Sequence, residues 1–170
     1  NDLDQPLRWM SHSGILVESK PTKLEEFNLK SATFWDDQTS TQLKFKVFTD
    51  ELNKRKALTS APPNFTHSLD GSHLNISLGR FVRWWLSMML EEGKILHKKT
   101  GEQPDVACVH DCYGTHAPYM GKFRGIIIVT FADIIDDEPL YKLCEAYGVT
   151  PPERGTLDTN EIRKALYALS

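Results

Sequence analysis

A long series of apolar residues at helical spacing limits the fold of this chain more than any other feature. The series runs from about His67 to Glu92, and its members recur at steps of three and four residues. They are Leu74, Leu78, Phe81, Val82, Trp85, Met88 and Met89. This spacing places an apolar face along one helix, and Gly93 is suited to end it. We therefore predict a long helix with one face buried in a core.

The sequence before this helix is typical of strands and turns. Residues 7–10 and 15–17 are apolar segments on either side of a polar, glycine-containing turn, which predicts a β-hairpin. Residues 43–47 alternate apolar side chains with lysine, as in a half-buried strand. A short helix is expected over residues 50–57, and the two prolines in residues 61–64 are expected to interrupt the chain.

An acidic residue lies at a predicted bend after the long helix. Residues 106–109 form a short apolar segment, His110 and Asp111 follow directly, and residues 113–115 can form a returning strand. A carboxylate at the end of a strand is held on rigid backbone, which suits a metal ligand. The same dipeptide is also common in ordinary turns, so its residue types alone leave both interpretations open.

Further helices are expected after this hairpin. The first begins near Pro118, because proline is tolerated in a first helical turn. Its buried face is formed by Met120, Phe123, Ile127, Phe131 and Ile134. Asp137 is placed to cap a second helix, and Asp158 is placed to cap a third that extends through Leu169.

Strand-rich sequence followed by helices and one hairpin predicts the α+β class. We expect a strand-rich extension in residues 1–65 and a helical part that carries the hairpin in residues 66–170. Apolar residues are 40% and charged residues 25% of the chain, which is an ordinary globular composition. No apolar run approaches ~18 residues, so we expect no membrane span and no membrane partner.

Charge and cysteine content exclude some classes of protein. The net charge of −3 does not favour a stand-alone nucleic-acid-binding protein, because such proteins usually present a basic surface. Cys108, Cys112 and Cys144 lack the spacing of a zinc or redox motif. Since no targeting segment is visible either, we expect reduced thiols and a cytoplasmic protein.

A polar cluster opens the long helix. His67 and His73 are six residues apart, whereas the histidine pair of a zinc protease helix is four apart, so zinc is poorly supported. Side chains at a helix start also bond its free backbone N–H groups. The pattern alone leaves a functional cluster and a polar helix start as equal alternatives.

Two longer segments together are similar to a known family. Residues 62–74, PPNFTHSLDGSHL, resemble the PPNFxHSLDxxH segment of single-subunit RNA polymerases of the bacteriophage and mitochondrial type. Residues 109–117, VHDCYGTHA, resemble motif C of these polymerases, VHDxxxTHA. Weaker similarity is present in residues 8–17, which lack the expected prolines, and in residues 154–158. The order and rough spacing agree from about residue 7 to the end.

The resemblance implies part of a polymerase palm, with a motif C hairpin packed by helices and a fingers-proximal extension in residues 1–65. Asp111 would bind one or both Mg²⁺ ions of a two-metal site, and His110 would contact the RNA 3′ end or the adjacent backbone. The implied nucleic-acid-binding positions are His67, Tyr113, Asp70 and His73. The implied reaction is nucleotidyl transfer from NTPs onto RNA, directed by a DNA template.

The resemblance also implies a partner. The family needs a second metal-binding aspartate on an earlier strand and a helix for the incoming nucleotide, and we find neither in these 170 residues. We expect a second polymerase subunit to supply both and to share the two Mg²⁺ ions. A split phage polymerase in the cytoplasm of an infected host cell is the expected setting.

Two other functions stay open. A stand-alone metal-dependent phosphohydrolase would use Asp111 with His67, His110 or His116, and would need neither partner nor template. A non-catalytic polymerase-like subunit would only bind a partner or nucleic acid, and would tolerate Asp111→Asn.

Overall fold

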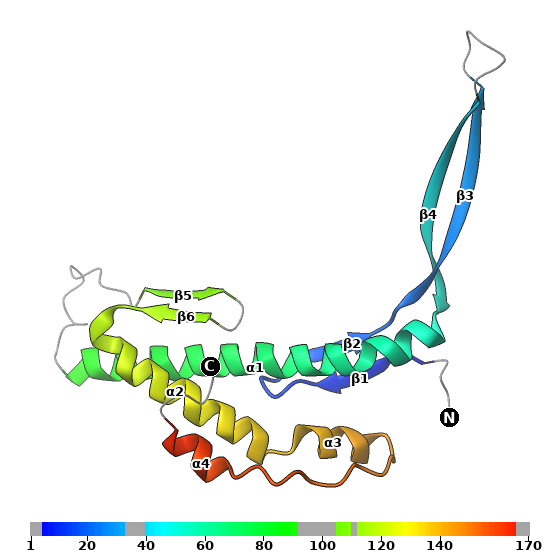
Figure 1. Ribbon diagram of the computed structural model, residues 1–170. Coiled ribbons are helices and arrows are strands. Elements are labelled where there is room, and N and C mark those ends of the chain that lie inside the picture. Colours follow the sequence, from blue (N-terminus) through cyan, green and yellow to red (C-terminus); the bar gives the residue numbers. More distant parts are fainter. Residues whose placement is uncertain (1–4, 33–39, 92–104, 110–111, 166–170) are drawn as a thin grey trace. The chain divides into compact units, whose positions relative to one another are not determined.

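A computed structural model describes residues 5–32, 40–91, 105–109 and 112–165 of the chain. The chain divides into two compact units. One contains Asn1–Trp9 and Val17–Phe65, and the other contains Met10–Leu16 and Thr66–Ser170. The elements are a mixture of hairpins and helices, which confirms the α+β prediction (Figure 1).

The first unit is built from two hairpins and the start of the long helix. Strands β1 (Leu7–Met10) and β2 (Leu16–Ser19) pair with each other, as predicted. Strands β3 (Thr22–Ala32) and β4 (Ser40–Leu52) form the longer hairpin, and helix α1 (Lys54–Glu91) follows it directly.

Contacts between α1 and the β1–β2 hairpin show the structural roles of Asn64 and Phe65 in the PPNF segment. Trp9 of β1 is buried, and its ring lies 5.9 Å from the ring of Phe65. The Asn64 amide donates a hydrogen bond of 3.1 Å to the buried Ser19 hydroxyl. Asn64 and Phe65 therefore attach the helix to the strands of this unit.

The β3–β4 hairpin is a strand pair, but its apolar side chains are exposed. Its register places Phe27 opposite Phe45 and Leu29 opposite Leu43. Phe45 is 46% exposed and Val47 51% exposed, so the predicted half-burial is wrong. Alternation normally reflects a core on one face, whereas this two-stranded sheet has no second layer among the described residues.

Helix α1 is longer than the sequence predicts. It continues through Pro62 and Pro63, where a break was expected, and joins the predicted helix before them to the one after. Each proline removes one backbone donor, so the carbonyls of Leu58 and Thr59 lose their helical partners. Both residues are exposed, and water can bond the freed carbonyls. Among the described residues, no helix is both long and apolar enough to cross a membrane.

The second unit contains the remaining elements and the core. Strands β5 (Val106–Val109) and β6 (Cys112–Thr115) form the predicted hairpin, and α2 (Ala117–Asp136) follows. The centre of the core is Phe81 of α1 with Phe123 and Ile127 of α2. The predicted apolar faces of both helices are confirmed at these positions, whereas Val82 and Met120, also predicted to be buried, are exposed.

The helix ends after α2 differ from the prediction in two places. Asp137 is the C-cap of α2, and Glu138 with φ 51° is the N-cap of α3 (Pro139–Ala146). Asp158 caps α4 (Thr159–Lys164) as predicted, by accepting from the Asn160 N–H at 2.8 Å. Ala165 ends α4 in extended conformation, earlier than predicted, and the rest of the predicted helix lies outside the described residues. Local capping rules place an acidic residue near a helix start, but they do not decide which of two neighbours takes the cap.

Candidate functional site

The β5–β6 hairpin carries the predicted motif C. Its ladder pairs Val106 with Thr115, and the pairing ends at Val109 with Cys112. The predicted catalytic residues His110 and Asp111 lie between the members of this last pair, outside the described residues. The structure therefore establishes the strands on either side of the dipeptide that is predicted to be catalytic.

The two cysteines of this hairpin are free thiols. Cys108 lies opposite Tyr113, and Cys112 lies opposite Val109. Because consecutive strand residues face opposite sides, the two thiols project from different faces of the hairpin and cannot bridge. Burial raises the pKa of the Cys108 thiol.

His73 and Tyr113 are brought together from α1 and β6. The Tyr113 hydroxyl lies 3.2 Å from His73 Nδ1, and His73 Nε2 lies 2.9 Å from the carbonyl oxygen of Ile127 on α2. The His73 ring also meets Tyr113 edge-on, at 5.9 Å between centroids. Only 6% of the His73 surface is exposed, so these contacts form a buried polar junction between three elements.

The other predicted positions on α1 lie elsewhere. His67 and Asp70 are exposed side chains one helical turn apart, so they share a face. His73 is three residues beyond Asp70 and six beyond His67, and unlike both of them it is buried. The cluster predicted from sequence is thus divided between a surface pair and a buried histidine.

Aromatic rings of the core pack against strand β6 of the β5–β6 hairpin. Phe81 and Phe123 pack with centroids 4.4 Å apart, and both are fully buried. Tyr113 meets Phe123 edge-on at 5.7 Å. Strand β6 therefore rests on the core of its unit, which gives the motif C hairpin a rigid base.

Metal binding at this place depends on residues beyond those described. Among the described residues, no group of three or more His, Cys, Asp or Glu side chains could hold a metal ion. Mg²⁺ prefers one or two protein carboxylates, with phosphate oxygens and waters as its other ligands. The one carboxylate of the predicted motif C, between β5 and β6 in the sequence, is of the chemical type that such a site uses.

An ionic cluster in the second unit was not predicted from the sequence. Asp133 of α2 accepts from Arg80 of α1 at 2.6 Å and from Arg163 of α4 at 2.9 Å. Arg163 also donates to Asp136 at 2.6 Å. Burial opposes ionisation of Asp133, but the hydrogen bonds from Arg163 and Arg80 prevail and hold its pKa below the ordinary value. These partners are far apart in sequence, and no local pattern indicates their pairing.

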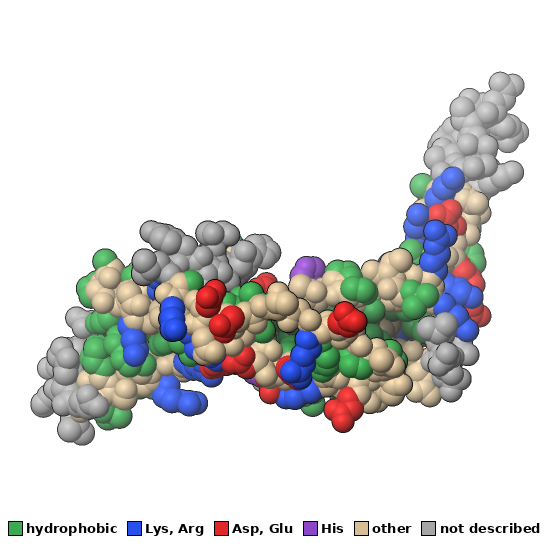
Figure 2. Space-filling view, turned by 60° about the horizontal axis from the view of Figure 1, so that its bottom comes forward, with side chains coloured by type: hydrophobic (Ala, Val, Ile, Leu, Met, Phe, Trp, Pro, Cys, Tyr) green, Lys and Arg blue, Asp and Glu red, His purple; other side chains and the backbone are tan. Residues whose placement is uncertain are grey.

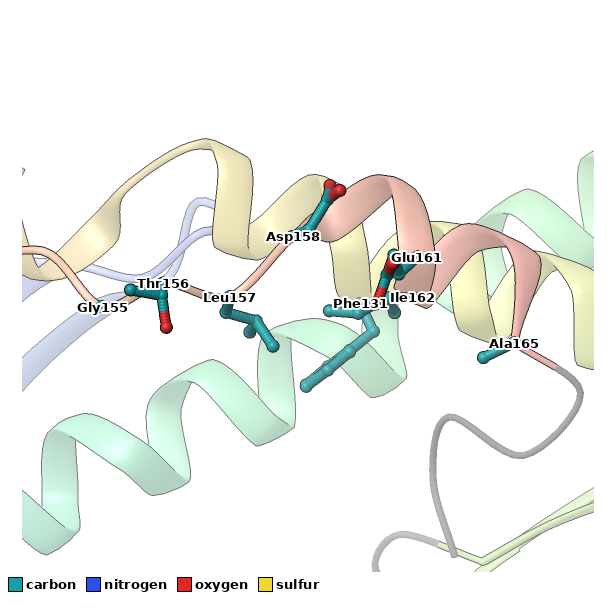
Figure 3. A pocket seen from close by; sticks show the side chains of 8 residues that line it. All are labelled: Phe131, Gly155, Thr156, Leu157, Asp158, Glu161, Ile162 and Ala165. Atoms are coloured by element: carbon teal, nitrogen blue, oxygen red, sulfur yellow. The ribbon is translucent and has the colours of Figure 1, made fainter.

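A pocket of about 950 Å³ lies between α2 and the segment that contains α4 (Figure 3). Its lining residues are Phe131, Gly155, Thr156, Leu157, Asp158, Glu161, Ile162 and Ala165. The Phe131 ring points toward Leu157, whereas the Asp158 carboxylate points away from it. Phe131 also meets the His73 ring edge-on at 5.8 Å, so this one side chain contacts both the pocket and the buried junction.

Charged side chains of both signs are interspersed on the face shown in Figure 2. On the β3–β4 hairpin, Lys23 pairs with Glu51 at 2.6 Å and Lys46 pairs with Glu26 at 3.0 Å. Such pairing leaves the described part of this hairpin without the single-sign surface of a strong phosphate-binding element.

Comparison with known proteins identifies the class. Residues 1–150 match the family described as DNA-dependent RNA polymerase. The chain is 29% identical over 173 residues to DNA-directed RNA polymerase 1A of Nicotiana tabacum, which covers 96% of this chain and 95% of that one. It is 29% identical to the mitochondrial DNA-directed RNA polymerase 1 of Nicotiana sylvestris, and 25% identical to the probable DNA-directed RNA polymerase of Neurospora crassa.

This chain belongs to the DNA-dependent RNA polymerase family, and the resemblance to single-subunit polymerases is confirmed. It spans 15% of the Nicotiana sylvestris polymerase and 14% of the Neurospora crassa polymerase. The matched segment is thus a small part of those two relatives and nearly the whole of the Nicotiana tabacum chain.

Proposed function

We propose that this chain supplies one metal-binding carboxylate, that of Asp111, to the nucleotidyl-transfer site of a DNA-directed RNA polymerase. The observation that carries the proposal is the VHDCYGTHA segment in a chain that matches this family. The pairing of β5 with β6 supports it, because Asp111 directly precedes the paired Cys112. Metal coordination requires a carboxylate on a rigid backbone, and these two paired strands flank Asp111 in the sequence.

The described residues contribute to this reaction by positioning. Helix α1 presents His67 and Asp70 on an exposed face, and we propose that His67 contacts the minor groove of the new base pair with support from Asp70. His110 adjoins Asp111 and is proposed to contact the RNA 3′ end. Polymerase catalysis consists mainly of aligning the 3′-hydroxyl with the α-phosphate and offsetting developing charge. Helices α1 and α2, which pack beneath the β5–β6 hairpin, provide the rigid support that this alignment needs.

Asp111 would hold Mg²⁺, and His110 is the adjoining polar group. When bound, two such ions lower the pKa of the attacking hydroxyl and stabilise the leaving pyrophosphate. One carboxylate is a sufficient share for this chain, because substrate phosphates and water complete the coordination of Mg²⁺.

We propose that the remaining catalytic groups come from a partner chain. These groups are the second aspartate and the helix that binds the incoming NTP. A site shared in this way needs an obligate interface, which usually buries more than ~2,000 Å². The exposed apolar residues of α1, Val82, Leu86 and Leu90, support such an interface, because a polymerase subunit would cover them.

RNA extension on a primed DNA template with Mg²⁺ tests the proposal. Three preparations are compared: the chain alone, the complex co-purified from its source, and that complex with Asp111→Asn. We expect the wild-type complex to extend the RNA and the chain alone not to do so. The Asp111→Asn complex should remain assembled but lose this activity. A matched control is Asp105→Asn, which alters a nearby exposed acid before the hairpin and should leave extension unchanged.

The other outcomes identify other functions. Undiminished extension by the Asp111→Asn complex would make this chain a non-catalytic subunit. Extension by the chain alone would refute the need for a partner. Release of phosphate from simple phosphoesters by the chain alone, without template, would support the phosphohydrolase.

A further inference from the structure

His73 is a residue by which α1 makes polar contacts with both α2 and β6. It projects from α1 into the junction with α2 and β6, where only 6% of its surface is exposed. Both ring nitrogens have polar partners there, Ile127 O at 2.9 Å and the Tyr113 hydroxyl at 3.2 Å. Aromatic rings meet two of its edges, since Tyr113 and Phe131 lie at centroid distances of 5.9 and 5.8 Å.

The chemistry of these partners decides which ring nitrogen of neutral His73 carries the proton. A backbone carbonyl only accepts hydrogen bonds, so the proton of neutral His73 must be on Nε2. Nδ1 is then an acceptor, and the Tyr113 hydroxyl donates to it. The two hydrogen bonds thus form a directed chain from Tyr113 through His73 to Ile127, in which each group has one role.

The first donor in this chain of hydrogen bonds, Tyr113, is close in sequence to the proposed catalytic carboxylate. Tyr113 is the second residue of β6 and follows Asp111 by two positions. Its ring also rests edge-on against Phe123 of the core, at 5.7 Å. A displacement of the Tyr113 hydroxyl would therefore move the strand from which the Asp111 backbone emerges.

We propose that His73 is a positioning residue, which fixes β6 through Tyr113 and thereby sets the geometry of Asp111. The inference rests on the proposed function, because it gives His73 a purpose only if Asp111 binds metal. It replaces a nucleic-acid contact for His73. A buried ring with both nitrogens engaged has no free donor or acceptor to offer to a base.

The test uses the complete polymerase that contains this chain. Three variants are compared with the wild type: His73→Leu, His73→Gln and Tyr113→Phe. Leucine removes both hydrogen bonds, glutamine restores a donor and an acceptor, and phenylalanine removes only the hydroxyl. The matched control is Asn75→Ala, an exposed residue two positions along the same helix. Each is assayed for kcat per folded molecule, for the Mg²⁺ concentration at half-maximal rate, and for affinity for the primed template.

We expect His73→Leu to lower kcat by roughly tenfold to a hundredfold, as loss of an outer-shell partner of a metal site does. The half-saturating Mg²⁺ concentration should rise, and template affinity should stay unchanged. His73→Gln should recover part of the loss, Tyr113→Phe should lose less than His73→Leu, and Asn75→Ala should match the wild type.

Other results would overturn the inference. A wild-type Mg²⁺ response and kcat per folded molecule in His73→Leu would show that the residue only stabilises the fold. Weaker template binding with an unchanged Mg²⁺ response would restore the nucleic-acid contact. If His73→Leu does not fold, wild-type values of both quantities in Tyr113→Phe would refute the proposal. Asp111→Asn in the same assay separates the proposed function from this inference. Its activity tests only whether Asp111 binds metal, whereas the His73 and Tyr113 variants test positioning.

Discussion

The β3–β4 hairpin and the motif C hairpin are both antiparallel strand pairs, yet their surroundings differ. Strand β6 lies on Phe123 and the buried His73, whereas Phe27 and Phe45 of the longer hairpin are 50% and 46% exposed. One hairpin is short and supported by a core, and the other is long and supported by its own cross-strand pairs.

This difference indicates what each hairpin can do. A two-stranded ribbon without a packed face is marginally stable in water, so it suits a surface that another molecule covers. The core beneath β6 supports the strand that follows Asp111, which suits the carboxylate proposed to bind metal, because such a group needs rigid backbone. The following substitutions test whether the contrast is real.

The largest effect is expected from Phe81→Ala. The Phe81 ring is fully buried at the centre of the core and stacks on Phe123 at 4.4 Å, so its removal leaves a cavity. Loss of such a ring lowers the free energy of unfolding by ~3–5 kcal/mol. Urea denaturation measures the change, and Val82→Ala on the exposed side of the same helix serves as control. A loss below ~1 kcal/mol would mean that the motif C hairpin does not rest on a tight core.

The next effect is expected in the turn of the β1–β2 hairpin. Gly14 has a φ of 82°, and Ser13 beside it donates its backbone N–H to the buried Ser72 hydroxyl at 3.3 Å. Alanine in a left-handed conformation costs about 1–2 kcal/mol, so Gly14→Ala should lower the midpoint of urea unfolding.

Gly79→Ala is the matched control for this substitution. Gly79 lies inside α1 with nothing within 4 Å of an added Cβ, and alanine should stabilise the helix there by ~0.5–1 kcal/mol. Equal responses at Gly14 and Gly79 would contradict the role assigned to the turn.

A smaller, pH-dependent effect is expected from Arg163→Gln. Arg163 donates to Asp133 and Asp136, and both carboxyls have a pKa below the ordinary value of 3.8. A lowered folded-state pKa gives stability that is complete above the ordinary value and is lost as pH falls through the lower folded value. The Tm of the variant should be a few degrees below that of the wild type at pH 7, and this gap should be narrower at pH 3, which is below the ordinary value of 3.8.

Lys46→Gln is the control for this ion pair. Lys46 pairs with Glu26 on the β3–β4 hairpin, with both side chains more than half exposed. Exposed pairs contribute little, so its Tm should not change at either pH. A gap for Arg163→Gln that persists unchanged at pH 3 would show that packing, rather than the carboxylates, attaches α4.

The sequence predicts local structure well where one segment decides it. The apolar spacing from Leu74 to Met89 and the cap at Asp158 depend on near neighbours, and both are found. The passage of α1 through Pro62 and Pro63 is missed, because a local rule assigns a break wherever a backbone donor is absent.

The site is predicted less completely, for a different reason. Motif similarity indicates His67, Asp70, His73 and Tyr113 as one group, but the fold exposes the first two and places the last two in a junction. The partner of His73 is a backbone carbonyl of Ile127, 54 residues away. A backbone acceptor leaves no signature in the sequence, so its pairing can be seen only in the folded chain.

The smallest effect on global stability is expected from Phe45→Ser in the long hairpin. Its ring lies opposite Phe27, and such a cross-strand aromatic pair is worth about 0.2–1 kcal/mol. Because neither ring is part of the core, the Tm should hardly change, while amide exchange should accelerate in β3 and β4 and stay unchanged in α2. Lys44→Ser, on the opposite face of the same strand, is the control. A destabilisation as large as that of Phe81→Ala would mean that this apolar face is already buried in the folded protein. An effect that appears only in the assembled polymerase would instead identify the face as part of its interface.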